Sequence, residues 1–171
     1  MMCGQFYIML HGKKQTIYPD DPYKIMIYDQ KRFSYQKANW GFKTHQRPII
    51  NARSETLLTK PTFIGLKHCL IMANGYYEWD AAKMKTDIHL KDHSYLYMAG
   101  LYRYQKDRYE YTIVTTKANS SVDQIHDRMP LILTKEEAEC WVREQETEEL
   151  LNVIPPSLQY EQEMSQIHLD V

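Results

Sequence analysis

Hydrophobic and polar positions alternate along several stretches of the chain, which is the pattern of half-buried β-strands. The clearest strand predictions are residues 94–104 and 109–116, which a loop over residues 105–108 would join as a hairpin. The polar loop between two such runs indicates antiparallel pairing. Further strands are predicted at residues 5–10, 23–28, 69–73, 76–79 and 130–133.

Helical patterns are few and short. Residues 54–59 and 61–68 each predict a helical piece, and Pro61 suits a helix start. Thr134-Lys135-Glu136-Glu137 matches a capping box, so a helix should run from there to about Val142. The sequence therefore predicts a single α+β domain over residues 1–171, with a mainly antiparallel, curved or barrel-like sheet covered by short helices. Residues 135–171 would form an acidic helical segment and tail.

The stretch from Asn74 to Trp79 combines a turn signal with an unusual carboxylate. Asn74-Gly75 predicts a tight turn, because both residues tolerate positive φ. Glu78 then stands among aromatic residues of a predicted strand. Such a carboxylate either faces water or is buried, where it needs a partner or a raised pKa. The sequence leaves both possibilities open.

Length and composition narrow the class of protein. The 171 residues suit one domain with a sizeable core. The three cysteines, Cys3, Cys69 and Cys140, are far apart, which argues against a disulfide framework or a zinc site. We expect no metal and no cofactor. No run approaches the ~20 apolar residues of a membrane span, and the N-terminus lacks a signal peptide, so we expect a soluble, cytoplasmic protein.

Charge is distributed unevenly along the chain. Residues 1–134 contain 19 basic and 12 acidic residues, whereas residues 135–171 contain 2 basic and 10 acidic residues. A basic body with an acidic tail is compatible with binding a polyanion. It is equally compatible with a body and tail that pair with each other.

Cys3 is the first candidate for chemistry. A free Cys is usually a small apolar residue, but Gly4 after it lets a ligand approach closely. If the preceding residues were removed, Cys3 would carry an α-amine and a thiol on adjacent carbons. Together these groups can trap an aldehyde, because the amine forms an imine and the sulfur then closes a thiazolidine ring.

Two further candidates are polar residues in irregular segments. His126 precedes a predicted strand and is either a titratable catalytic group or a surface histidine bonded to Asp127. Asn51 and Arg53 are two residues apart and would face the same side of an extended segment. An amide that orients a nucleophile and a guanidinium that binds phosphate make a plausible pair. The alternative is a turn-forming Asn with an Arg53–Glu55 surface pair.

Six motifs in order resemble one family. They are Met2-Cys3-Gly4, INARSET at 50–56, CLI-x-A-x-GYYEW at 69–79, Ala99-Gly100-Leu101-Tyr102, TIVTTKAN at 112–119 and IHDRMP at 125–130. Together they resemble the SRAP (SOS response-associated peptidase) family over residues 2 to about 134. The resemblance implies a protein, expected to be a monomer, that binds single-stranded DNA and forms a covalent thiazolidine crosslink with the ring-opened abasic site.

The resemblance also implies a role for each site residue. Cys3 would be the nucleophile, and Asn51 would orient its amino and thiol groups. Glu78 and His126 would act as general acids and bases. Among the DNA-binding residues, Arg53 and Arg128 would contact phosphates, and Trp40 and Trp79 would lie near displaced bases.

Three features depart from the family pattern. Gln5 replaces an expected Arg, so one phosphate contact is missing. The segment between Trp40 and Asn51 is short and lacks a second Trp. The chain begins Met1-Met2-Cys3, and methionine removal before Met2 is not expected. We therefore expect translation to start at Met2; an added Met1 or self-cleavage of a leader are the alternatives.

Two other function classes remain open at this point. A papain-like cysteine hydrolase or peptidase would use Cys3, His126 and Asn51 and would need no free amine. A non-catalytic single-strand-binding module would need only Arg53, Arg128 and the tryptophans.

Overall fold

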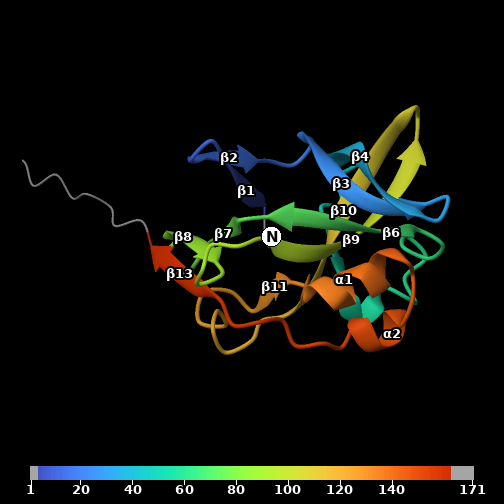
Figure 1. Cartoon of the computed structure of the whole chain (residues 1–171). Helices are drawn as coiled ribbons and strands as arrows, with labels where there is room; N and C mark the ends of the chain where they lie inside the picture. The colour runs from blue at the N-terminus through green and yellow to red at the C-terminus, as the bar shows by residue number, and fades with distance from the viewer. Residues whose placement is uncertain (1–3, 163–171) are drawn as a thin grey trace, which may run out of the picture.

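Residues 4–162 are described in the computed structural model of the chain, and the thirteen strands found there form two sheets (Figure 1). The smaller sheet is antiparallel throughout. Its strand order places the first strand of the chain beside the strand that carries Glu78. The order is β13 (Gln159–Gln162), β8 (Lys85–His89), β7 (Gly75–Trp79), β1 (Gln5–Leu10) and β2 (Lys13–Ile17).

The larger sheet closes into a barrel, because β10 pairs with both β4 and β9. Its pairs are antiparallel except those of β10 with β4 and β5. The expected curved, mainly antiparallel sheet is thus confirmed. The order is β11 (Arg128–Pro130), β10 (Arg108–Lys117), β4 (Arg32–Trp40), β3 (Pro22–Asp29), β6 (Lys67–Ala73), β9 (Leu96–Gln105) and β12 (Ile132–Leu133), and β5 (Asn51–Arg53) pairs with β10.

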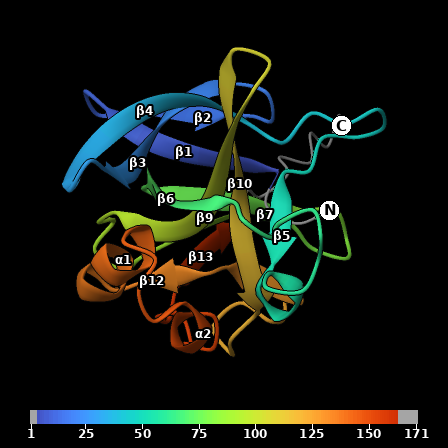
Figure 2. The ribbon, with the colours of Figure 1, turned by 90° about the vertical axis from the view of Figure 1, so that its right-hand side faces the viewer.

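Alternation along the strands divides the apolar residues between two cores. In β6, Cys69 and Ile71 join a cluster with residues of the smaller sheet such as Phe6 and Tyr76. Leu70, between them, joins a second cluster on the opposite face. Helix α1 (Lys135–Val142) covers that face and buries Ala138, Trp141 and Val142 against it (Figure 2). The barrel therefore has one face toward the smaller sheet and one toward the helix.

The Asn74-Gly75 pair does not form the predicted tight turn. β6 ends at Ala73 and pairs with β9 and β3, whereas β7 begins at Gly75 and pairs with β1 and β8. The chain passes at Asn74 from one sheet to the other, and neither residue has positive φ. Gly75 is needed for a different reason: an added Cβ would lie 2.6 Å from the Tyr7 ring carbons Cε1 and Cζ. A close aromatic contact therefore replaces the expected turn.

The helical predictions are confirmed in part. Thr134 and Glu137 form the predicted capping box of α1. Residues 54–59 form only a short 3-10 helix, η1 (Ser54–Thr56), and then turns. The helix predicted over residues 61–68 is wrong: turns lead into β6, which starts at Lys67.

After α1 the chain forms a short helix, α2 (Thr147–Leu150), and then adds β13 to the smaller sheet. The expected acidic tail is therefore a strand in its first part, up to Gln162. Among the described residues, no helix has the length and apolar character needed to cross a membrane.

Candidate functional site

Glu78 is a buried carboxylate in the middle of the smaller sheet. Its exposed fraction is 2%, and Tyr76 and Tyr77 before it are also buried. Glu78 pairs across the strands with the buried Thr86. Gln5, at the start of β1, pairs with Tyr77, so the described chain begins beside Glu78. The alternative of a water-facing Glu78 is wrong, and Cys3 lies outside the described residues.

Asn51 and Arg53 are held along the edge of β10. In the parallel pairing of β5 with β10, Asn51 faces Ile113 and Arg53 faces Thr115. Ala52 between them is buried, whereas Arg53 is exposed. The amide nitrogen Nδ2 of Asn51 is buried and has no hydrogen-bond partner within residues 4–162. A buried donor without a partner is costly, so this amide is available to bind and orient another group.

His126 has a fixed ring orientation. Its Nδ1 accepts a hydrogen bond of 3.0 Å from the backbone N–H of Arg128, and Oδ1 of Asp127 lies 3.0 Å from the same nitrogen. A hydrogen bond accepted at Nδ1 places the proton of a neutral ring on Nε2, whereas a hydrogen bond to Asp127 places it on Nδ1. The side chain is 25% exposed. His126 thus has the Asp127 contact of the surface alternative, and its ring is held in a fixed direction.

Arg128 is bound within the protein. Its guanidinium contacts both carboxylate oxygens of Glu55, with a distance of 2.9 Å for Nη2–Oε2. Nη2 also donates to the backbone oxygen of Thr115 at 2.8 Å. Only 12% of the side chain is exposed. A phosphate would have to share or displace this bidentate partner, so the expected phosphate contact of Arg128 is less simple than that of Arg53.

Glu55 pairs with Arg128 and not with Arg53, the partner it has in the surface-pair alternative. The Arg53–Glu55 surface pair is not formed, and no ion pair of Arg53 is found in the described part of the chain. The hydrogen bond from Arg128 lowers the pKa of the Glu55 carboxyl, which stays ionised over the neutral range. In the sequence, only the position of Glu55 in a predicted helical turn pointed to this pairing. In the structure that turn, η1, places Glu55 against Arg128 of β11, which also contacts Thr115 of β10.

The two tryptophans of the expected site have opposite environments. Trp40 is fully buried, and its indole N–H donates to the backbone oxygen of Ile50 at 3.0 Å. Its expected contact with DNA bases does not fit this position; instead it anchors the chain just before Asn51. Trp79 is 38% exposed at the end of β7 and is accessible to a ligand.

One apolar cluster holds the supports of these side chains together. Ile50, Tyr76, Ile125 and Met129 all belong to it. Ile50 precedes Asn51, Ile125 precedes His126, Met129 follows Arg128, and Tyr76 is two residues before Glu78 on the same strand face. Residues far apart in the sequence are therefore supported by one shared core.

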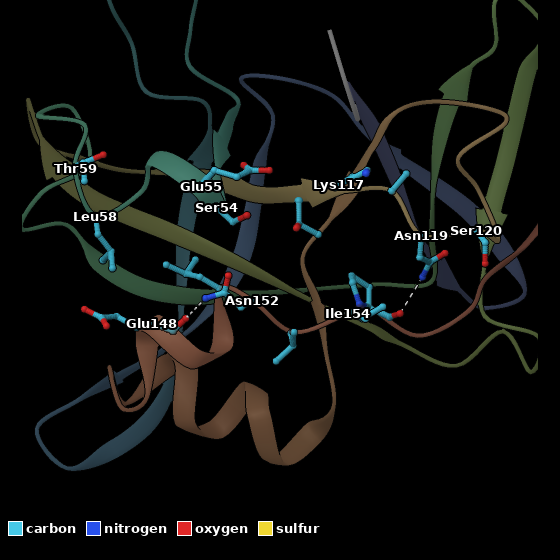
Figure 3. A pocket seen from close by; sticks show the side chains of 15 residues that line it. Ser54, Glu55, Leu58, Thr59, Lys117, Asn119, Ser120, Glu148, Asn152 and Ile154 are labelled. Atoms are coloured by element: carbon cyan, nitrogen blue, oxygen red, sulfur yellow. Dashed lines mark hydrogen bonds between the residues drawn. The ribbon is translucent and has the colours of Figure 1, made fainter.

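A cleft of about 830 Å³ adjoins the Glu55–Arg128 pair (Figure 3). Glu55 and Lys117 lie on one side of it, and Glu148 and Asn152 of the α2 region lie on the other. Among the described residues, no group of three or more His, Cys, Asp or Glu side chains could hold a metal ion. Carboxylate, amide, hydroxyl and ammonium groups line the cleft, so a ligand there can form ion pairs and hydrogen bonds.

Comparison with solved structures gives the same fold. A phage-related protein from Bordetella bronchiseptica superposes with a TM-score of 0.78 at 24% identity, over 95% of each chain. A protein from Bacteroides thetaiotaomicron gives a TM-score of 0.72 at 28% identity, over 86% of this chain and 76% of the other.

Sequence comparison gives the family. The protein named abasic site processing protein YoqW, from Bacillus subtilis, is 40% identical over 112 residues, which cover 58% of this chain and 50% of YoqW. Abasic site processing protein YedK of Escherichia coli is 32% identical over 119 residues, which are 62% of this chain and 54% of YedK. The chain thus spans about half the length of such relatives. The profile described as SOS response associated peptidase (SRAP) matches residues 2–171. The chain therefore belongs to the SRAP family.

Proposed function

We propose that this protein processes abasic sites in single-stranded DNA by binding them covalently through Cys3, acting as a cytoplasmic monomer. Relatives that carry the name abasic site processing protein support the choice of substrate. The observation that carries the proposal is the burial of Glu78 beside the start of β1. A carboxyl group in that position can exchange a proton with a group bound at the N-terminal end of the strand.

The proposed reaction releases one water molecule. Glu78 transfers the proton that opens the sugar ring to its aldehyde. The α-amine of Cys3 attacks the aldehyde carbon, and loss of water gives an imine. The thiolate of Cys3 then forms a C–S bond to the imine carbon, and the nitrogen takes up a proton, which closes the thiazolidine ring.

Asn51 and His126 would assist these steps. The Nδ2 group of Asn51 would orient the amino and thiol groups of Cys3. His126 would act as a second acid and base in capture and would also assist reversal of the crosslink. Arg53 would hold a phosphate beside the lesion. Arg128 would do so only if its guanidinium bound the phosphate and Glu55 at the same time. Trp79 would stack on a base.

The mechanism requires a free amine on Cys3. A chain that starts at Met2 would expose it after methionine removal, and a chain that keeps both methionines would have to cleave its own leader. Autoproteolysis of this kind is the part of the proposal that the family's peptidase name supports.

The test is capture of an abasic single-stranded oligonucleotide, followed by denaturing gel and intact mass. Protein with a free Cys3 should give an adduct whose mass is the sum of both molecules less one water. Cys3→Ala should give none. An adduct from a chain with a blocked amine would indicate thiol-only chemistry, as in the cysteine hydrolase alternative. Binding without any adduct would leave only the single-strand-binding module.

Glu78→Gln separates chemistry from binding. The amide keeps the shape of the buried side chain but cannot exchange a proton, so we expect capture to slow by roughly a hundredfold. Affinity for an undamaged oligonucleotide should change less than about twofold. Normal capture by Glu78→Gln, measured as adduct against time, would remove Glu78 from the mechanism.

A further inference from the structure

An apolar groove crosses the helix-covered face of the barrel, away from the candidate site. Two adjoining hollows, of about 230 and 270 Å³, share Met26, Tyr35, Leu70 and Met72. Methionine side chains adapt to different apolar partners, which suits a binding surface. Each hollow is too small for a cofactor and is of a size to take apolar side chains.

The groove is open because α1 covers only part of this face. β6 lies between α1 on one side and the β3–β4 hairpin on the other (Figure 1). β3 pairs with β6 only through Met26 and Leu70, so the two strands diverge on either side of this point. The face left between the hairpin and the helix forms the hollows.

Large apolar side chains are exposed along the groove. Tyr35 is 59% exposed, and Leu10 and Tyr95 at one end are 48% and 45% exposed. Phe33 and Met9 add to the same surface. Soluble proteins rarely leave a contiguous apolar patch of this kind uncovered unless it binds a partner.

The rim of the groove is basic. Lys24 lies over the Tyr35 ring, with Nζ 5.2 Å from its centre, and pairs across the strands with Lys37. Lys135 lines the other side. None of these three lysines has an ion pair with another described residue, and Glu139 is the acidic residue in the lining. Unneutralised cations around an apolar floor favour an anionic, apolar ligand.

We infer that this groove binds a short acidic peptide segment of a partner protein, with apolar side chains inserted in the two hollows. Carboxylates on the segment would face Lys24, Lys37 and Lys135, and leucine or phenylalanine side chains would contact Met26 and Met72. A nucleic acid strand fits less well, because the floor is formed by aliphatic and methionine side chains that offer bases few hydrogen bonds.

The groove and the candidate site are on different sides of the molecule. Figure 2 places α1 and β3 on the opposite side from β5. A peptide in the groove and DNA at the candidate site could therefore be bound together. The inference does not depend on the proposed chemistry, because peptide binding is measurable without DNA.

The first experiment is selection of a displayed library of random short peptides on the immobilised full chain, with elimination of binders to a Tyr35→Glu variant. Enrichment of sequences that combine Asp or Glu with Leu, Ile or Phe would support the inference. Enrichment of basic sequences, or no enrichment that depends on Tyr35, would overturn it.

Solution binding supplies the matched controls. By fluorescence polarisation, a labelled peptide of alternating Asp and Leu or Phe should lose affinity about tenfold or more with Tyr35→Glu and with Lys24→Glu. Tyr104→Glu, at a tyrosine that is 60% exposed but outside the groove, and Lys106→Glu should not change it. Both tested side chains are exposed, so the fold should tolerate the changes.

Other occupants give distinct results. Binding of labelled oligothymidylate that is lost with Tyr35→Glu would make the groove a nucleic acid site and overturn the inference. Tenfold tighter peptide binding by a chain shortened to residue 162 would show that the chain's own residues 163–171 compete for the groove, which would also overturn it. Dimerisation that Tyr35→Glu abolishes would assign the groove to a second copy instead.

Discussion

At the level of single residues, Glu55 is expected to matter for capture and little for stability. Glu55 is half exposed, and Gln keeps an oxygen that can accept from Arg128, which also retains its bond to the Thr115 carbonyl oxygen, so we expect a loss of at most about 1 kcal/mol. Glu55→Gln should therefore unfold at nearly the same denaturant concentration as the parent. It should nevertheless slow abasic-site capture several-fold. Loss of the ion pair loosens the side chain of Arg128, and the backbone N–H of Arg128 orients His126.

The control for this prediction is Glu136→Gln, at an exposed glutamate in the first turn of α1. Equal capture by the parent and Glu55→Gln would mean that Arg128 keeps its position through Thr115 alone. The lowered pKa of Glu55 determines the pH range over which the Glu55–Arg128 ion pair exists. The pair is lost only as pH falls through that lowered pKa, below the ordinary range of a glutamate carboxyl, so its titration cannot shape a capture profile near neutral pH.

Gly75 is expected to be intolerant of any side chain. Gly75→Ala would push a methyl group against the Tyr7 ring, whose hydroxyl is held by Asp87 at 2.9 Å. Overpacking of this kind destabilises by about 1–3 kcal/mol. Urea unfolding measures it, and Gly4→Ala, where an added Cβ meets nothing within 4 Å, is the matched control. Equal losses in both variants would mean that Tyr7 moves aside freely.

At the level of elements, local patterns predicted the long strands and the capped helix correctly. β9, β10 and α1 each contain their own signal: long runs rich in aromatic, aliphatic and β-branched residues in the strands and a capping box in the helix. The destination of a strand is not local. Asn74-Gly75 has the composition of a hairpin turn, but β6 and β7 take their partners from distant segments, and these pairings override the turn preference.

The same reasoning explains which site residues the sequence could identify. The aromatic neighbours of Glu78 were visible in the sequence but left its burial open, and the position of β7 between β1 and β8 decides it. The burial of Trp40 depends on Phe6 and Tyr111 from other strands, which pack against its ring. The pairing of Glu55 with Arg128 joins residues 73 positions apart. Contacts of this range come from the sheet order and not from any single motif.

The attachment of α1 to the barrel predicts a pH-dependent stability. His68 of β6 stacks on Trp141 of α1 with ring centres 4.0 Å apart, and its Nδ1–H donates to the Trp141 carbonyl oxygen at 2.9 Å. Burial lowers the pKa of His68 below its usual 6.5, although the carbonyl and Glu144 partly oppose this. The folded state therefore binds the proton less readily than the unfolded state. The contribution of neutral His68 to the free energy of unfolding is therefore fully present above pH 6.5 and is lost as pH falls from there through the lowered pKa.

Denaturant unfolding between pH 7.5 and 5 measures this effect. The slope from one such group is at most about 1.4 kcal/mol per pH unit, and His68→Gln should reduce it. His11→Gln, at an exposed turn residue, should leave it unchanged. An unchanged slope in His68→Gln would assign the acid sensitivity to other groups.

At the level of the whole molecule, the net charge differs between parts of the structure: residues 1–134 hold 19 basic and 12 acidic residues, and residues 135–171 hold 2 basic and 10 acidic residues. The acidic residues after Lys135 that the structure describes are concentrated in α1 and α2, where Glu136, Glu139, Glu148 and Glu149 are exposed. The sheets hold most of the basic residues. The charge asymmetry of the sequence is thus a separation between elements, and DNA should meet the protein at the sheets.

Salt dependence tests this arrangement. The affinity for single-stranded DNA should fall with salt, with a slope of about −0.7 for each phosphate contact in a plot of log affinity against log salt concentration. Arg53 is exposed and has no ion pair in the described chain, so it is ready to bind a phosphate without losing a partner. Arg53→Ala should reduce the slope by about 0.7 and weaken binding equally on any sequence, because a phosphate contact carries no base information. Arg32→Ala, at the exposed turn between β3 and β4, should change neither quantity. If Arg53→Ala instead weakened binding to some sequences and left the slope intact, Arg53 would contact a base and not the phosphate proposed for it.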